Sequence, residues 1–561
     1  MSTTGPTSPP PDAPGVDAPL ADDPVSQSLV EPGAGPVAAR AAGRGMLRSS
    51  AVYSGLTLVS RFMGFLRDLV ISARIGASAT AAGDAYNTML WFPNLFRRIF
   101  AEGAFATAFV PAYAKSLARD GEEVADVLAA DALATLAAAT VAVTVACDLA
   151  MPWLMLVISP GFTADPVKFK LAVTLTQISM PYLVCMAIYA HLAGVLQARG
   201  KFALSALAPT LLNAVMLAAV WPQHDAVSAA HAASWAVLGA GVLQAGLLWW
   251  GVSKSGARVT LRLPRLTPEI KALILLAVPG AIAASATQIN IAVSGILASQ
   301  VNGARSWLAT ADRLYQLPLG LVGVAIGVAL LPRLSTTVQA KDEAGAQGAM
   351  DEAVTLSMAL TLPAAAALVA IPVFLIDALF TRGAFLPVDA RETASALLHY
   401  GWGVPAFVLA RILNQGFFAR QDTRTPMRFA LISVAVNIVA GVGLFLLVGF
   451  QGIAAATSLA AWINVAQMVT TLRARGWWRP GPQLLSRLVR ILLASAVMGG
   501  VLAVLSAGRP LIEPTLLGRK ELALAVSCLA GGLLYLLLLP LTRAVTPAEV
   551  RGLFRRGRGG A

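Results

Sequence analysis

Apolar segments of about 20 residues or more recur along most of this chain, and polar or charged connections separate them. Each segment is long enough to cross a hydrocarbon core of about 30 Å as a helix. The pattern therefore predicts fourteen membrane-spanning helices. They lie near residues 50–73, 84–113, 127–149, 167–196, 203–222, 229–252, 270–299, 306–331, 352–378, 393–418, 428–449, 451–471, 487–507 and 521–541.

Composition supports this interpretation. Of 561 residues, 57% are hydrophobic and 13% are charged, and the mean hydropathy is +0.70; soluble domains have about 45–50% apolar and about 25% charged residues. These values exclude a soluble enzyme, a secreted disulfide scaffold and a disordered protein. The three cysteines and four histidines are scattered, so we expect no metal, cofactor or catalytic triad. The net charge of +13 suggests loops that face anionic lipid rather than a nucleic-acid partner.

The distribution of Lys and Arg predicts the orientation of the chain. We call the membrane side that carries the N-terminus side A and the opposite side B. The predicted connections carry 27 Lys or Arg residues on side A and nine on side B, and six of the 42 lie within spans. Because positive loops stay in the cytoplasm, side A is predicted to be cytoplasmic, with both termini there.

Two stretches resemble each other, LQARGKFALSALAPTLLNAV (196–215) and FFARQDTRTPMRFALISVAVNIV (417–439). One follows the fourth predicted span and the other follows the tenth. This offset indicates two six-helix halves related by an axis along the membrane normal, followed by a final helix pair. The predicted parts are a disordered cytoplasmic tail (1–45), an N-lobe (46–255), a C-lobe (256–475), helices thirteen and fourteen (476–545) and a basic cytoplasmic tail (546–561).

Six arginines lie within the predicted spans, where each costs about 2.5–3.5 kcal/mol at a helix centre. Internal partners or a hydrated cavity must offset this cost; snorkelling to the headgroups remains an alternative for the arginine near a helix end, Arg411. Arg98 and Glu102 can pair at i, i+4, and Arg61 shares a helix face with Asp68. The arginines left without an obvious partner on their own helix are Arg67, Arg97 and Arg313.

These three arginines lie at overlapping depths on the first, second and eighth predicted spans, which belong to both halves. The guanidinium group binds phosphate oxygens two at a time and stays charged in a low dielectric. The pattern therefore predicts an anion site between the lobes. A purely structural arginine network is the alternative.

Four motifs around these residues identify a known family. SRFMGFLRD (60–68), GDAYNTMLWFPNLFRRIFAEGAFATAFVP (83–111), ADRLYQLPLGLVGVAIGVALLPRLS (311–335) and GFFARQDTRTP (416–426) resemble the MurJ (MviN) family of lipid II flippases in the MOP exporter superfamily. The resemblance runs from about residue 46 to residue 541. It implies an all-α membrane protein with about 14 helices, two MATE-like lobes around a cationic cavity, and a terminal helix pair that forms a lipid groove.

The resemblance also implies roles for individual residues. Arg67, Arg97 and Arg313 match the family's essential cavity arginines, which are proposed to hold a diphosphate. Arg61 matches another required arginine, and Asp84 matches the acid that starts helix two, although Ala-Ala-Gly precedes it here where the family usually has Thr. Further residues occupy motif positions with less defined roles: Ser60, Asp68, Arg98, Glu102 and Ser306.

The function implied is alternating-access transport of lipid II from the cytoplasmic to the periplasmic leaflet of the bacterial inner membrane. The expected partners are lipid II, membrane lipids and proteins of peptidoglycan synthesis. A membrane enzyme is disfavoured because no Asp-rich motif is present, and a cation-coupled drug exporter because the buried charge is basic. A flippase for another polyprenyl-diphosphate glycan would need the same cationic cavity, so only the family motifs distinguish this alternative from a lipid II flippase. The Leu-rich final helices are expected to contact the lipid tail or simply to face the bilayer.

Overall fold

The computed structural model describes residues 55, 59–98, 105–516 and 518–544, and every regular element in them is helical. The first helix covers residues 59–75. The remaining elements, in chain order, are α2 (Ala82–Arg97), α3 (Phe105–Arg119), α4 (Glu122–Ile158), the short 3-10 helix η2 (Pro160–Ala164), α5 (Pro166–Ser179), α6 (Tyr182–Ala198), α7 (Ala203–Val220), α8 (Ala226–Lys254), α9 (Pro268–Ala298), α10 (Ala304–Gln339), α11 (Glu343–Ala370), α12 (Pro372–Phe380), α13 (Pro387–Gly401), α14 (Val404–Phe418), α15 (Arg424–Val448), α16 (Gln451–Ala474), α17 (Pro482–Ala507), α18 (Arg509–Thr515) and α19 (Lys520–Leu541).

Ten helical segments of the described chain are long and apolar enough to cross a membrane. Their outer faces carry bare aliphatic side chains; Leu446 and Leu447 on α15, for example, are 78% and 79% exposed. Such surfaces suit hydrocarbon rather than water. The prediction of an all-helical, multi-pass membrane protein is therefore confirmed. The number fourteen stays a prediction, and both predicted tails and parts of the first two spans lie outside the described residues.

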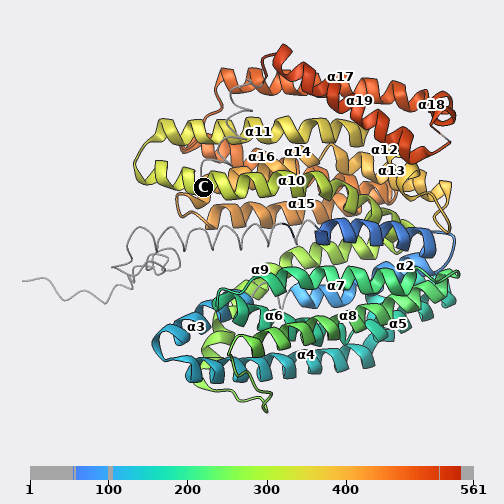
Figure 1. The fold of residues 1–561 in the computed structure, drawn as a ribbon. Coiled ribbons are helices and arrows are strands. Elements are labelled where there is room, and N and C mark those ends of the chain that lie inside the picture. The colour runs from blue at the N-terminus through green and yellow to red at the C-terminus, as the bar shows by residue number, and fades with distance from the viewer. Residues whose placement is uncertain (1–54, 56–58, 99–104, 517, 545–561) are drawn as a thin grey trace, which may run out of the picture.

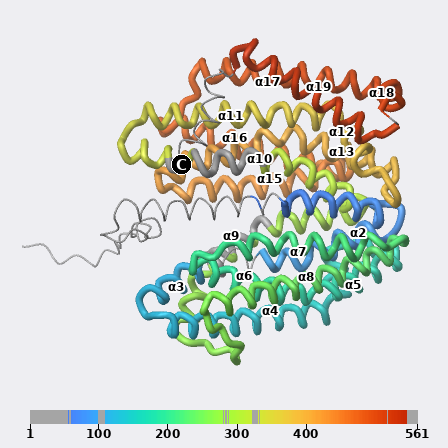
Figure 2. The backbone as a smooth tube through the Cα atoms, in the orientation of Figure 1, coloured from blue at the N-terminus to red at the C-terminus, as the bar shows by residue number. Residues whose placement is uncertain are grey.

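The helices form two groups that lie side by side (Figures 1 and 2). Helices α2 to α8 pack with one another in the first group, and α10 to α16 pack in the second. Each group has its own apolar clusters, one around Met89 and Met155 and another around Ile412 and Phe417. Helices α17 and α19 lie on the outer flank of the second group, with α17 packed against α11.

Two helices contact both groups. In the first helix, Ile71 and Ile75 join the apolar cluster of the first group, whereas Phe65 packs against a cluster of the second. Helix α9 contacts α3 and α4 on one side and α15 on the other. Its first turns belong to a cluster of the first group through Ile270 and Leu273. Helix α9 therefore links the groups, although the sequence places it wholly in the C-lobe.

The terminal helices are fixed to the second group by polar contacts as well as apolar ones. Asp377 on α12 pairs with Arg509 at the start of α18 and with Lys520 at the start of α19, the latter at 3.2 Å. The hydroxyl of Tyr535 on α19 donates to the carbonyl of Ala359 on α11 at 2.6 Å. These contacts dock the terminal pair on the C-terminal group, and its predicted contact with a lipid tail stays a prediction.

At the side B end, where α18 lies in Figure 1, backbone from the two groups touches directly. The amide of Ala384 donates to the carbonyl of Ala73 at 2.8 Å. Gly76 has φ +74°, and a Cβ there would lie 2.4 Å from the carbonyl oxygen of Ala384. Only glycine accepts both this conformation and this approach. The turn after the first helix therefore fits closely against the turn before α13.

Candidate functional site

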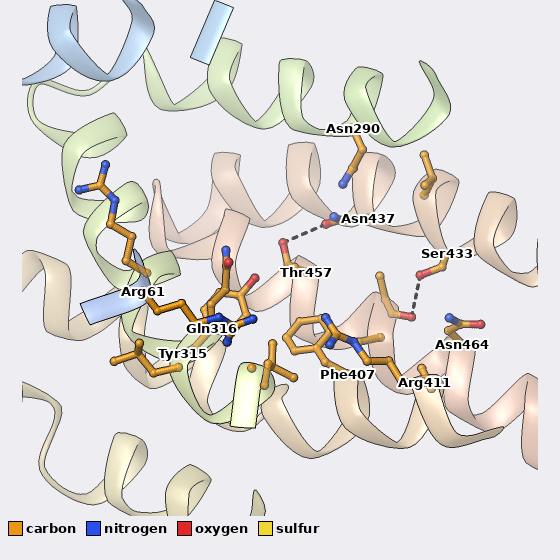
Figure 3. Close-up of a pocket in the computed structure, with 18 of the residues that line it drawn as sticks. Arg61, Asn290, Tyr315, Gln316, Phe407, Arg411, Ser433, Asn437, Thr457 and Asn464 are labelled. Carbon is orange, nitrogen blue, oxygen red and sulfur yellow. Dashed lines mark hydrogen bonds between the residues drawn. The ribbon is translucent and has the colours of Figure 1, made fainter. Parts of the chain in front are cut away.

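A cavity of about 820 Å³ lies between the first helix, α9 and the second group of helices, and Figure 3 shows much of its lining. The first helix contributes Arg61 and Asp68, and α10 contributes Arg313. Helices α9 and α14 to α16 complete the wall. Among the described residues, the charged lining consists of three arginines, the third being Arg411, and one aspartate. The cavity is therefore positively charged, and Arg411, for which snorkelling was the alternative, lines it.

Asp68 joins the two helix groups at the edge of this cavity. Its Oδ1 accepts from Nε and Nη2 of Arg67 at 3.0 and 2.7 Å, and it lies 3.0 Å from Nη1 of Arg313 on α10. The three side chains are only 10–24% exposed. Ion pairs in such a setting interact more strongly than on an open surface. One carboxylate thus holds two guanidinium groups, which leaves a net positive charge.

The expectation that Arg67 has no partner on its own helix is wrong. Backbone positions one residue apart do point about 100° apart, but the long Arg67 side chain bends back to reach Asp68 with two of its nitrogens. Its Nη1 also donates to Oδ1 of Asn213 on α7 at 2.8 Å. Arg67 is therefore anchored beside the cavity and is not part of its lining.

The predicted pairing of Arg61 with Asp68 is also wrong, because Asp68 is taken by Arg67 and Arg313. Arg61 instead extends across to α10, where a Cβ on Gly320 would lie 1.9 Å from its Nη1. It forms no ion pair with another residue that the structure describes. Its guanidinium group therefore remains available at the cavity wall (Figure 3).

The other predicted residues lie outside the cavity lining. The Nε of Arg97 donates to Oδ1 of Asn94, one turn earlier on α2, at 2.7 Å. Arg98 is exposed, and its predicted partner Glu102 lies outside the described residues. Ser60 contributes its carbonyl oxygen, which accepts from Nδ2 of Asn213 at 2.9 Å. The structure thus brings together Arg61, Arg67, Asp68 and Arg313, but it does not bring Arg97 into the cavity.

Asp84 occupies a different position, at the side B end of the same interface. Its side chain is almost fully buried and lies 3.2 Å from Nζ of Lys168 on α5. The carboxylate also accepts from the amide of Gly303 at 2.8 Å, and from the amide and hydroxyl of Ser306, both at 3.2 Å. Gly303 is the N-cap residue of α10 and Ser306 lies in its first turn, so Asp84 caps that helix from the other group. Asp84 and Ser306, which the sequence singled out separately, therefore form one contact between the groups.

A second buried aspartate, Asp389 on α13, was not singled out from the sequence. It accepts from the hydroxyl of Ser78 at 2.5 Å and from Nε1 of Trp307 at 2.8 Å. It also caps its own helix through the amide of Leu386 at 2.9 Å. The acid three residues into a helix that begins with Pro is a recognisable sequence signal. No comparable sequence signal predicts its pairing with Ser78, which lies 311 residues earlier.

Comparison with protein families matches this geometry to a known group of transporters. The family model described as lipid II flippase MurJ matches residues 71–510. The match covers both helix groups and the carboxylates Asp84 and Asp389.

The chain belongs to the MurJ family.

Curated members of the MurJ family match over most of the chain. A protein named "Probable lipid II flippase MurJ" from Rhizobium meliloti (strain 1021) is 40% identical over 464 residues, which cover 82% of this chain and 86% of that protein. The protein named "Lipid II flippase MurJ" from Burkholderia cenocepacia is 33% identical over 464 residues, or 82% of this chain and 89% of the relative. The resemblance identified from the sequence motifs is therefore confirmed.

Solved structures give the same fold. A "Lipid II flippase MurJ, inward closed conformation" superposes with a TM-score of 0.72 at 24% identity, covering 88% of this chain and 98% of that one. An inward-facing multidrug resistance transporter of the MATE family in the MOP superfamily gives 0.59 at 14% identity, covering 76% and 97%. The predicted fold class, a MurJ protein with two MATE-like lobes, is thus confirmed.

Proposed function

We propose that this protein moves lipid II from side A to side B, from the cytoplasmic to the periplasmic leaflet of the bacterial inner membrane. The observation that carries the proposal is the meeting of Arg61, on the first helix, and Arg313, on α10, at one cavity beside Asp68. An anion that binds both guanidinium groups contacts α10 of the second group and the first helix, which packs against both groups. The names of the relatives supply the identity of the lipid.

The chemistry of the cavity fits a diphosphate. Burying an unpaired anion in hydrocarbon costs tens of kcal/mol by Born estimates, so a diphosphate needs charged partners along its whole path. Arginine provides these in a planar fork that matches two phosphate oxygens. The cationic lining disfavours the organic cations that a cation-coupled drug exporter carries. The polyprenyl tail remains in the bilayer, and only the headgroup needs to enter the cavity.

We assign Asp68 the role of a counter-ion that is released when substrate binds. It holds Arg67 and Arg313 in place while the cavity is empty, since each guanidinium group would otherwise lie without a partner in a low-dielectric site. A dianionic substrate competes with it for the same donors. Asp84, with Ser306, closes side B in this assignment. The conformation described here then receives its substrate from side A.

The decisive test compares two arginines of the same helix. In cells depleted of the native protein, we expect Arg313→Ala to fail to restore lipid II at the outer leaflet, because the substrate loses a cavity cation. Arg333→Ala should restore it, since Arg333 is exposed and pairs with Glu352 outside the cavity. Lipid II is measured by its reactivity toward an externally added lipid II-cleaving enzyme, at matched protein levels. Equal restoration by both variants would contradict the proposed site, and an unchanged lipid II level on depletion would contradict the function.

A further inference from the structure

One wall of the cavity carries no charge and is built from amide and hydroxyl groups. Ser433 and Asn437 on α15 and Thr457 and Asn464 on α16 line it, and Figure 3 shows them on neighbouring helices. All four come from the C-terminal group, whereas Arg61 and Asp68 come from the first helix. The cavity therefore combines three arginines, Arg61, Arg313 and Arg411, with a neutral polar wall on α15 and α16, and Arg411 on α14 lies beside this wall (Figure 3).

The side-chain amides of this neutral wall make few hydrogen bonds to other described residues. Asn464 makes no side-chain hydrogen bond to another described residue, and its Oδ1 is buried without a partner. The Oδ1 of Asn437 accepts one long bond, 3.5 Å from the hydroxyl of Thr457, which leaves its NH₂ group free among the described residues. A buried amide that lacks partners is costly. Buried polar groups that lack partners and line a cavity in a membrane protein are suited to bind a polar ligand.

The internal repeat sharpens this contrast. Each of the two similar stretches, 196–215 and 417–439, carries one asparagine in its apolar run, Asn213 in the first and Asn437 in the second. In the first half, both ends of the Asn213 amide are hydrogen-bonded within the protein, because it accepts from Arg67 at 2.8 Å and donates to the carbonyl of Ser60 at 2.9 Å. In the second half, Asn437 faces the cavity instead. The asparagine of the first stretch is thus hydrogen-bonded within the protein, whereas the asparagine of the second stretch lines the cavity.

Aromatic rings lie next to the neutral wall. Phe407 and Tyr315 both line the cavity, and their rings stack with centroids 5.5 Å apart. Amides both donate and accept hydrogen bonds, so they can pair with hydroxyl and N-acetyl groups alike. Aromatic faces add apolar contact area. A few placed polar groups beside aromatic surface are typical of a pocket for a neutral polar ligand.

We propose that Asn437, Thr457 and Asn464, with Phe407 beside them, form a subsite for the sugar part of the substrate headgroup. This inference rests on the proposed function, in which Arg61 and Arg313 hold the diphosphate. The subsite binds sugar hydroxyl and N-acetyl groups, and it separates a glycosylated polyprenyl diphosphate from a bare one. It is therefore a specificity-determining region, distinct from the cationic region that any polyprenyl diphosphate engages.

The test uses two probes that share the tail and the diphosphate: lipid II and undecaprenyl diphosphate, which lacks the sugars. Binding of each to the purified full-length protein is measured by native mass spectrometry. We expect the wild type to prefer lipid II, and the double variant Asn437→Ala/Asn464→Ala to lose about tenfold in affinity for lipid II, as expected for two lost hydrogen bonds. Its affinity for undecaprenyl diphosphate should stay within about twofold of wild type. Arg313→Ala should weaken both probes.

Gln467→Ala provides the matched control. Gln467 lies one turn beyond Asn464 on α16 and also has a buried amide oxygen without a partner, but it does not line the cavity. The control should keep the preference for lipid II. A double variant that keeps the full preference, or that loses both probes equally, would overturn the subsite. If folded wild-type protein binds neither probe, the proposed function itself fails, and the subsite with it.

Discussion

At the scale of single residues, three buried or nearly buried aspartates connect the two helix groups. Asp68 reaches Arg313, Asp84 reaches the start of α10, and Asp389 reaches Ser78. Each carboxylate takes several donors, as a buried charge requires. The first lies at the cavity, and the other two lie at the side B end. We interpret the first as part of substrate binding and the others as part of closure.

Removing the carboxylate of Asp84 should weaken side B closure strongly. Asp84→Ala leaves the buried Lys168 ammonium and the amide of Gly303 without their acceptor, and breaking a buried pair in this way costs about 3–5 kcal/mol. Adding Lys168→Met removes the stranded charge and should recover part of the loss. Thermal unfolding of the purified variants measures both effects.

An exposed carboxylate provides the scale for this comparison. Asp225 caps α8 through the amide of Ser228 at 2.9 Å, and Asp225→Ala should cost about 1 kcal/mol. An Asp84→Ala variant as stable as Asp225→Ala would mean that the contact between the groups contributes little. A double variant less stable than Asp84→Ala alone would contradict the role given to Lys168.

The sequence predicts some of these residues but not their partners. Arg61, Arg67 and Arg313 stand out because charges within apolar segments are costly. Which of these arginines pairs with Asp68 depends on side-chain length and helix tilt, and residue spacing gives no information about either. Spacing therefore assigned it to Arg61, and the geometry assigns it to Arg67 and Arg313. Asn213 carried a weak signal, as the asparagine shared by the repeat.

At the scale of elements, the hydrophobic pattern predicts most helices well, because long apolar runs leave few alternatives in a bilayer. The breaks within spans were harder to predict. The fourth predicted span, 167–196, is divided into α5 and α6 by a turn at Met180 and Pro181. The division of α9 between the groups was also missed, since an apolar helix carries no sign of which neighbour it covers.

The contact between the turns at Gly76 and Gly383 should control opening on side B. Gly76→Ala places a Cβ 2.4 Å from the carbonyl oxygen of Ala384, and so should push the turns apart. Opening is measured in a variant without native cysteines and with Ala410→Cys in the cavity. An impermeant maleimide added outside the cells should then react several-fold faster with this cysteine.

Gly449→Ala is the control for backbone strain. Gly449 has φ +78°, close to that of Gly76, but a Cβ at this position would have no other atom within 4 Å. Both variants carry the same penalty, about 1–2 kcal/mol, for a left-handed residue. Equal maleimide rates in the two variants would show that the contact between the turns does not hold side B closed.

At the scale of the whole molecule, the fold class and the family follow from the sequence, and the pairing of the halves does not. Asp84 and Gly303 are 219 residues apart, and Ser78 and Asp389 are 311 apart. Such pairs depend on how two complete helix groups incline toward each other. Local periodicity fixes each helix separately, so it contains no information about this angle.

The proposed orientation can be tested with two single cysteines. Thr163, in η2, is exposed at the side B end, and Lys341 is exposed in the connection between α10 and α11 at the side A end. In a variant without native cysteines, Thr163→Cys should react with an impermeant maleimide added to intact cells with a permeabilised outer membrane. Lys341→Cys should react only after lysis. The reverse pattern would place the termini outside and invert the transport direction.

The first turn of α10 contacts both of the aspartates that lie at the side B end. Ser306 there is bound to Asp84 from one group, while the next residue, Trp307, is bound to Asp389, which in turn holds Ser78. One turn of α10 therefore contacts both acids, so we expect the bond of Asp84 to Ser306 and the bond of Asp389 to Ser78 to break together when side B opens. If only one of these contacts broke, a buried carboxylate would lose its partners, which is costly, so we expect partly open states of side B to be sparsely populated.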